Sequence, residues 1–166
     1  RQNYEQFSQE LRAAGDFGDS FDYVVGAYYF KSDYTLRQST RLFAFNPAID
    51  PVQADGNPQT VNGKTKSVAL FGDFNWAFAD QWRLSFGGRF TKDKKALDNA
   101  FGGVVIGSGS DSFKKFTPKV GIDFRPNDDT MIYASWSRGF RSGGFSPRAG
   151  SPISAARSYG PETVDS

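Results

Sequence analysis

The segment SWSRGFRSGGFSP, residues 135–147, holds the residue types best suited to anion binding. Three glycines free its backbone, and two arginines bring planar guanidinium groups that bind carboxylates and phosphates bidentately. Three aromatic rings lie among them. The segment is expected to hold a phosphate, contact another ligand or only end a strand, depending on the structure that positions it.

Catalytic signatures elsewhere in the chain are weak. Ser112 to Lys115 matches S-x-x-K without its companion motifs, and GSGSDS at residue 107 lacks the lysine of a phosphate loop. Asp128 and Asp129 are better explained by a turn than by acid–base chemistry. The sequence contains no cysteine and no histidine, the commonest metal ligand and general base. We therefore expect no enzymatic activity, no cofactor and no metal site.

The composition favours a β protein. Aromatic residues reach 16% and there are 18 glycines among 166 residues, enough for one domain. The net charge of +2 gives no indication of a nucleic-acid partner. No apolar run approaches the ~20 residues of a membrane helix, but barrel strands alternate and keep a low mean hydropathy.

Alternation of apolar and polar residues predicts several strands. In QWRLSFGGRFTK, Trp82 and Phe90 share an apolar face, whereas Arg83 and Arg89 lie on the other. The same pattern recurs in SFDYVVGAYYFK, KSVALFGDFNWAF and KKFTPKVGIDFRP. In the last of these, Pro118 lies near the expected strand start, where a missing N–H matters least.

Aromatic spacing and connection lengths indicate a membrane barrel. The pairs Phe21 and Tyr29, Trp82 and Phe90, and Phe116 and Phe124 are each eight residues apart on one face. Eight residues cover ~26 Å along a strand, or ~20 Å along a barrel axis at a tilt of ~40°, close to the ~25 Å apolar band. Short connections near 15–19, 79–80 and 126–129 alternate with long ones at 46–63, 98–112 and 142–160.

Two architectures remain open at this point. A soluble β-sandwich accounts for the alternation, but not for the one-sided connection lengths or the repeated aromatic spacing. About six strands and the start of a seventh can be counted, and seven strands in lipid would leave open edges. A membrane protein would therefore need further strands.

The chain resembles TonB-dependent outer-membrane receptors. The resemblance lies in TPKVGIDFRPNDDTMIYASWSRGFRSGGF, followed by YGPETVDS, and in FSQELRAAG followed by FDYVVGAYYF. It implies an all-β, antiparallel transmembrane β-barrel of about 22 strands around a plug, of which this chain supplies about seven. We expect residues 1–166 to be part of the barrel domain, with the plug domain, TonB box and signal peptide absent from this chain.

The resemblance also implies a function. Members import scarce ligands such as ferric siderophores, using energy relayed by the TonB complex, so the implied partners are TonB, a small-molecule ligand and outer-membrane lipid. The implied location is the outer membrane of a Gram-negative bacterium. The alternatives are a passive porin-type barrel and a soluble carbohydrate-binding β-sandwich.

Residue placement follows from short periplasmic turns and long extracellular loops. Residues 130–140 would then rise outward and 141–160 would lie at the cell surface. Ile132, Ala134 and Trp136 are expected to face lipid, although the opposite register remains open. The candidate ligand-binding residues at the outer mouth are Arg138, Phe140, Arg141 and Phe145. Their alternative role is to anchor the barrel rim or to pair with lipopolysaccharide phosphates. The expected lumen-facing residues are Arg83, Arg89, Lys119 and Asp123.

Overall fold

The computed structural model describes residues 1–40, 57–147 and 156–166, and nearly all of them lie in β-strands. No helix among these residues is long and apolar enough to cross a membrane. The elements in chain order are β1 (Gln2–Asp16), the short 3₁₀ turn η1 (Gly18–Ser20), β2 (Phe21–Thr40), β3 (Asn57–Ala79), β4 (Trp82–Phe101), β5 (Val104–Asn127), β6 (Thr130–Arg141), β7 (Gly144–Phe145), β8 (Ser158–Tyr159) and β9 (Glu162–Asp165).

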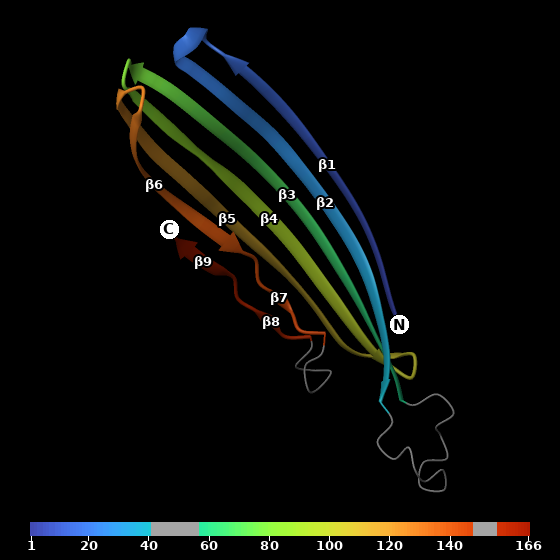
Figure 1. Cartoon of the computed structure of the whole chain (residues 1–166). Helices are drawn as coiled ribbons and strands as arrows, with labels where there is room; N and C mark the ends of the chain where they lie inside the picture. Colours follow the sequence, from blue (N-terminus) through green and yellow to red (C-terminus); the bar gives the residue numbers. More distant parts are fainter. Residues whose placement is uncertain (41–56, 148–155) are drawn as a thin grey trace, which may run out of the picture.

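Seven strands form one antiparallel sheet in the order β1-β2-β3-β4-β5-β6-β9 (Figure 1). Each strand from β1 to β6 pairs with its neighbour in the chain, and β7 and β8 form a separate small hairpin. The strands β2 to β5 each have 20 to 24 residues, far beyond the five or six usual in soluble sheets. This confirms the predicted all-β, antiparallel fold and its strand count.

The three predicted short connections are confirmed, and they lie together at one end of the sheet, the upper left in Figure 1. We call this the short-turn end. The predicted long connection at 98–112 is wrong, because β4 and β5 continue through it to a turn at Gly102 and Gly103. Both glycines have positive φ, 56° and 87°, the conformation that a two-residue hairpin turn requires. Of the predicted connection at 46–63, residues 57–63 belong to β3 and the rest lie outside the described residues.

Pro118 lies in the middle of β5 and not near its start, which corrects the predicted strand boundary. The Arg125 N–H donates to the Gln81 carbonyl, so odd-numbered β5 residues direct their backbone groups toward β4. Pro118 therefore directs its missing N–H toward β6. The β5–β6 ladder ends one residue earlier, at Lys119 and Ser137. The proline thus removes no hydrogen bond from a continuous ladder, because the pairing of β5 with β6 does not extend past Lys119 and Ser137.

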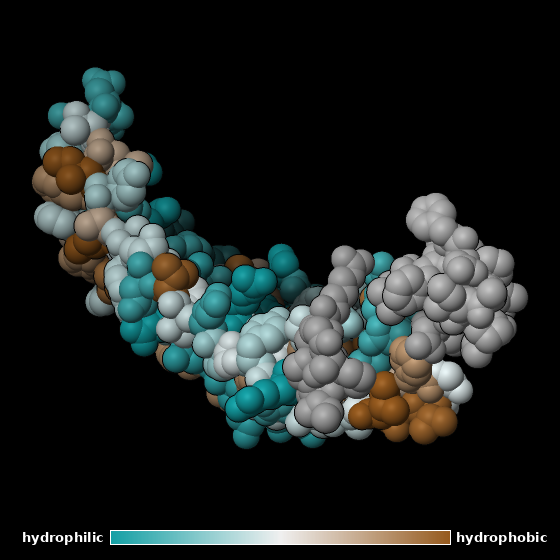
Figure 2. All heavy atoms as spheres, turned by 90° about the horizontal axis from the view of Figure 1, so that it is seen from below, coloured by the Kyte–Doolittle hydropathy of each residue, from teal (hydrophilic) through white to brown (hydrophobic). Residues whose placement is uncertain are grey.

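The sheet is strongly curved, so its two faces differ. Figure 2 shows the curvature as a hollow with mostly hydrophilic residues along its rim and larger hydrophobic patches on the outer side. On the convex face large apolar side chains are exposed, for example Leu70 at 61% and Phe116 at 55%. The neighbouring residue Ala69, on the concave face, is 1% exposed, as is Leu97. The small core therefore lies in the hollow.

Candidate functional site

The convex face carries a continuous apolar band. The register places aromatic rings of adjacent strands side by side, with Trp82 and Phe124 stacked at 4.3 Å and Phe74 and Phe86 at 5.2 Å between centroids. The band's exposed members include Val25, Val68, Leu70, Trp76, Trp82, Phe86, Phe90, Phe116, Val120, Ile122, Ile132 and Trp136. A single-layer sheet with so much exposed apolar surface requires apolar surroundings.

A lysine ends this band on four consecutive strands. On each strand it lies ten residues from an aromatic residue near the short-turn end and on the same face; the pairs are Phe21 and Lys31, Trp76 and Lys66, Trp82 and Lys92, and Phe124 and Lys114. Ten residues cover ~33 Å along a strand, which a tilt of ~40° reduces to ~25 Å, the height of the apolar band of a membrane barrel.

The boundary runs obliquely across the sheet. Lys31 lies in one row with Lys66, Lys94 and Ser112, one residue on each strand from β2 to β5. Arg138 of β6 lies one residue past the end of the β5–β6 ladder, at the level of Pro118, which is six residues along β5 from Ser112. Six residues amount to ~20 Å along the strands, against ~19 Å across four strand spacings. The cations thus follow a line at about 45° to the rows, which is the strand tilt of membrane barrels.

Behind the apolar band, the concave face carries charged side chains. The structure places the four expected lumen-facing residues there, with Arg83 directly opposite Asp123. The Lys119 Nζ lies 2.8 Å from the Asp73 carboxylate. The Arg89 guanidinium lies over the Tyr28 ring at 5.2 Å from its centroid. Each contact reaches past one intervening strand, from β5 to β3 and from β4 to β2, so the charged groups of this face are held by contacts across the sheet.

Within the predicted connection at 142–160, residues 144–145 and 158–159 pair as β7 and β8, and residues 148–155 lie outside the described residues. The β7–β8 hairpin packs on the concave face of β4 and β5. The Lys95 Nζ donates to the Gly143 carbonyl at 2.8 Å. The Ser158 Oγ donates to the Asp111 carboxylate at 2.7 Å. Gly143 is buried, and a Cβ there would collide with Phe113 and the Tyr159 carbonyl. The absence of a side chain therefore lets the segment lie directly against the strands.

Ionisation in this region follows burial and hydrogen bonding. The groups concerned lie beyond the lysines, outside the apolar band. The Ser158 hydroxyl and the Ser112 N–H hold the pKa of the Asp111 carboxyl below its usual value. Burial lowers the pKa of the Lys95 ammonium, with Asp93 acting in the opposite direction. The hairpin thus contacts a carboxylate whose charged form is favoured and a partly desolvated ammonium group.

The structure does not bring the four candidate ligand-binding residues together. Arg138 and Phe140 alternate with residues of the concave face and lie on the convex face, in register with Trp136, whereas Arg141 lies on the opposite face. Arg138 binds Asp165 bidentately, at 2.7 and 2.9 Å, and lies over the Trp136 ring. Phe145 belongs to the hairpin on the concave face.

On β6, Ile132, Ala134 and Trp136 lie on the convex face. They pair with Phe124, Ile122 and Val120 of the apolar band. The lysines at the edge of the band are functional candidates that sequence reasoning missed. The sequence contained a signal for these lysines. Each one is an even number of residues from the aromatic residues on its strand, and so on the same face, and the spacing is the same on all four strands.

A curved antiparallel sheet of long tilted strands, apolar outside and charged inside, defines a segment of an outer-membrane-type β-barrel. The family model for the TonB dependent receptor-like β-barrel matches residues 1–166, and the chain belongs to this family. Its resemblance to that family, predicted from the sequence, is confirmed.

A solved structure supports the fold. The chain is similar to the crystal structure of the ferric yersiniabactin uptake receptor FyuA from Yersinia pestis, with a TM-score of 0.78 and 20% identity. The match covers 98% of this chain and 25% of that one, so the chain spans about a quarter of the receptor's length. No curated protein matches the sequence.

Proposed function

We propose that the chain is part of a TonB-dependent transporter in the outer membrane of a Gram-negative bacterium. The transporter takes up a scarce small ligand such as a ferric siderophore, with energy from the TonB complex. The observation that carries this proposal is the division of one sheet into a convex face suited to lipid and a concave face lined by charge. Membership of the receptor family and the likeness to a ferric yersiniabactin uptake receptor support it.

The two edges of the sheet support a larger barrel. Among the described residues, β1 and β9 each pair on one side only. Unpaired backbone groups in hydrocarbon cost several kcal/mol each. Residues 1–166 would therefore be part of the barrel domain, closed by further strands, and the plug and its contact with TonB would come from outside these residues.

The ligand's route would follow the concave face. Of the four candidate residues, Arg141 and Phe145 lie on this face, near the lysine end of the strands. The Arg141 side chain is 80% exposed, and its only ion pair among the described residues is a long one, 3.9 Å, to Glu162. It is therefore available to an anionic ligand, with Arg89 and Lys119 further along the same face.

Uptake measurements test the proposal. Cells expressing the complete receptor are supplied with radiolabelled ferric siderophores of the catecholate, hydroxamate and phenolate types, with and without TonB. We expect TonB-dependent uptake of at least one type, and about a tenfold or greater loss with Arg141→Ala. Unchanged affinity and uptake in this variant would exclude Arg141 as a ligand contact.

Two further outcomes would contradict the proposed function itself. Uptake that persists without TonB would indicate a passive pore, and complete protein recovered from the soluble periplasm would exclude a membrane barrel. Arg125→Ala is the matched control, because Arg125 is an exposed concave-face arginine at the short-turn end of β5. We expect its uptake to equal that of the wild type.

A further inference from the structure

We propose that five lysines on the convex face bind the phosphate groups of outer-leaflet lipids. They are Lys31, Lys66, Lys92, Lys94 and Lys114, and we call them the lysine belt. The proposal rests on the proposed function in one respect, namely that the convex face meets the outer membrane. It adds a binding site on the surface that faces away from the ligand's route.

The belt places like charges directly against one another. Lys66 lies opposite Lys31 on β2 and opposite Lys94 on β4, and Lys92 lies opposite Lys114 on β5. Directly opposed residues on one face have Cβ atoms only ~4.5–5.5 Å apart, and like charges at this distance are destabilising. A row of three ammonium groups therefore needs an anion to offset their repulsion.

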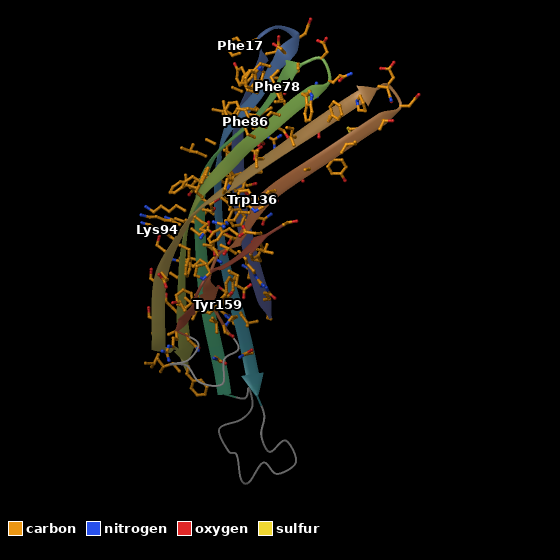
Figure 3. The ribbon with its side chains drawn as sticks, turned by 90° about the vertical axis from the view of Figure 1, so that its left-hand side faces the viewer. Phe17, Phe78, Phe86, Lys94, Trp136 and Tyr159 are labelled. Atoms are coloured by element: carbon orange, nitrogen blue, oxygen red, sulfur yellow. The ribbon has the colours of Figure 1, made fainter. Side chains whose placement is uncertain are left out.

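The protein supplies little of that negative charge. Lys31 pairs with Asp33 at 3.1 Å. The other four belt lysines have no acidic partner within ion-pair distance in residues 1–40, 57–147 and 156–166. Lys31, Lys66, Lys94 and Lys114 are exposed, and Figure 3 shows Lys94 projecting away from the convex side of the sheet. Among the described residues, acidic side chains thus offset the charge of the belt only at Lys31, and the rest of its positive charge is presented outward.

The position of the belt identifies the anion. Phe90 is two residues from Lys92 and Phe116 is two residues from Lys114, both on the same face and inside the apolar band. A lipid whose acyl chains cover the band would place its headgroup phosphates at the level of these ammonium groups. The apolar stem of lysine covers the band's edge while its charged end reaches the headgroup layer. Tyr159 lies on the other side of the same strands, in the hollow (Figure 3), so the belt does not face the ligand's route.

A triple variant tests the belt. Lys31→Gln, Lys66→Gln and Lys94→Gln are combined in the complete receptor, purified in uncharged detergent. Its binding of phosphorylated lipid A is compared with its binding of the same lipid after removal of the phosphates. Because each lysine near an anionic surface contributes about fivefold, we expect roughly 10- to 100-fold weaker binding of the phosphorylated lipid from the triple variant. Binding of the dephosphorylated lipid should not change.

The matched control removes the same charge from the concave face. It combines Arg12→Gln, Lys115→Gln and Arg125→Gln, which lie on that face of β1 and β5. We expect the control to bind phosphorylated lipid like the wild type. Equal losses in the two triple variants would overturn the proposal, since net charge and not the belt would then set the affinity.

Two other measurements test whether the bound anion is a lipid phosphate or a free phosphate, and whether the opposed lysines destabilise the protein without lipid. Inorganic phosphate at millimolar concentration should not displace the lipid; full displacement would mean that the belt is a free-anion site. Without lipid, Lys66→Gln should raise the unfolding temperature, because it removes repulsion from both neighbours. A lowered temperature would contradict the opposed-charge geometry. Siderophore uptake is measured in parallel in cells, whereas lipid binding is measured on purified protein. A failure of the proposed function can therefore be told apart from a failure of the lysine belt.

Discussion

Replacement of Val120 by arginine gives the sharpest test of the convex face. Val120 lies on β5 between Phe86 of β4 and Trp136 of β6, and is 43% exposed. It is four residues from Phe124 and six from Lys114, the two ends of the apolar band on its strand. At ~2.5 Å of axial rise per residue for a tilt of ~40°, it lies within ~3 Å of the middle of the band.

An arginine at this depth on a lipid face costs about 2–4 kcal/mol. The folded-to-unfolded ratio in a bilayer should therefore fall by roughly 30- to 1,000-fold. The measurement is reversible denaturant unfolding of the complete barrel in lipid vesicles, followed by tryptophan fluorescence. Ser135→Arg is the control, because Ser135 lies one row away on the exposed concave face. A concave-face surface substitution should stay within about 0.5 kcal/mol.

The comparison between these two variants decides the orientation of the sheet. Equal destabilisation by Val120→Arg and Ser135→Arg would refute a lipid-facing convex surface. A larger loss from Ser135→Arg would mean that the concave face is the buried one, as in a β-sandwich. The predicted difference depends only on the observed register of β5 with its neighbours.

Two further predictions concern the β7–β8 hairpin. Gly143→Ala should detach the hairpin from β4 and β5 at a cost of about 1–3 kcal/mol, because the added methyl group collides with Phe113 and the Tyr159 carbonyl. Faster hydrogen exchange in residues 142–147 would report this detachment, and unchanged protection would contradict the packing. Asp111 has a lowered pKa in the folded protein, so its contribution is fully present above the usual carboxyl pKa of about 4 and is lost as the pH falls through the folded value. In the wild type, the hydrogen-exchange rate of the hairpin amides should therefore rise below about pH 4, whereas their protection should not change with pH near neutrality. Asp111→Asn should remove the pH dependence.

Period-two alternation made most of the sheet predictable. A strand such as β4 must turn Trp82 and Phe90 to one side and Arg83 and Arg89 to the other, whatever its partners are. The aromatic spacing then indicated a membrane span, and the structure extends it to the lysines. Residues 98–112 misled the prediction because glycine and serine are typical of loops, whereas here they continue two strands beyond the band to a tight turn.

The hairpin could not be predicted because its contacts join distant parts of the chain. Lys95 and Gly143 are 48 residues apart, and Asp111 and Ser158 are 47 apart. Local composition predicts a connection over 142–160, but not which face of the sheet its ends contact. Only the curvature of the finished sheet provides the hollow into which the hairpin fits.

Because the sheet has two distinct faces, contacts with the surrounding membrane and contacts with the ligand can be separated experimentally. Convex-face residues such as Val120 and Lys66 contact what surrounds the barrel, so their replacement should alter stability or lipid binding without altering ligand affinity. Concave-face residues such as Arg141 should do the reverse. Arg138 is the informative exception, since it ends the oblique line of cations and yet holds β9 through Asp165. Replacement of Arg138 should weaken the β6–β9 pairing more than it weakens lipid binding or ligand affinity. The relative size of these three losses therefore measures how far the two faces act independently.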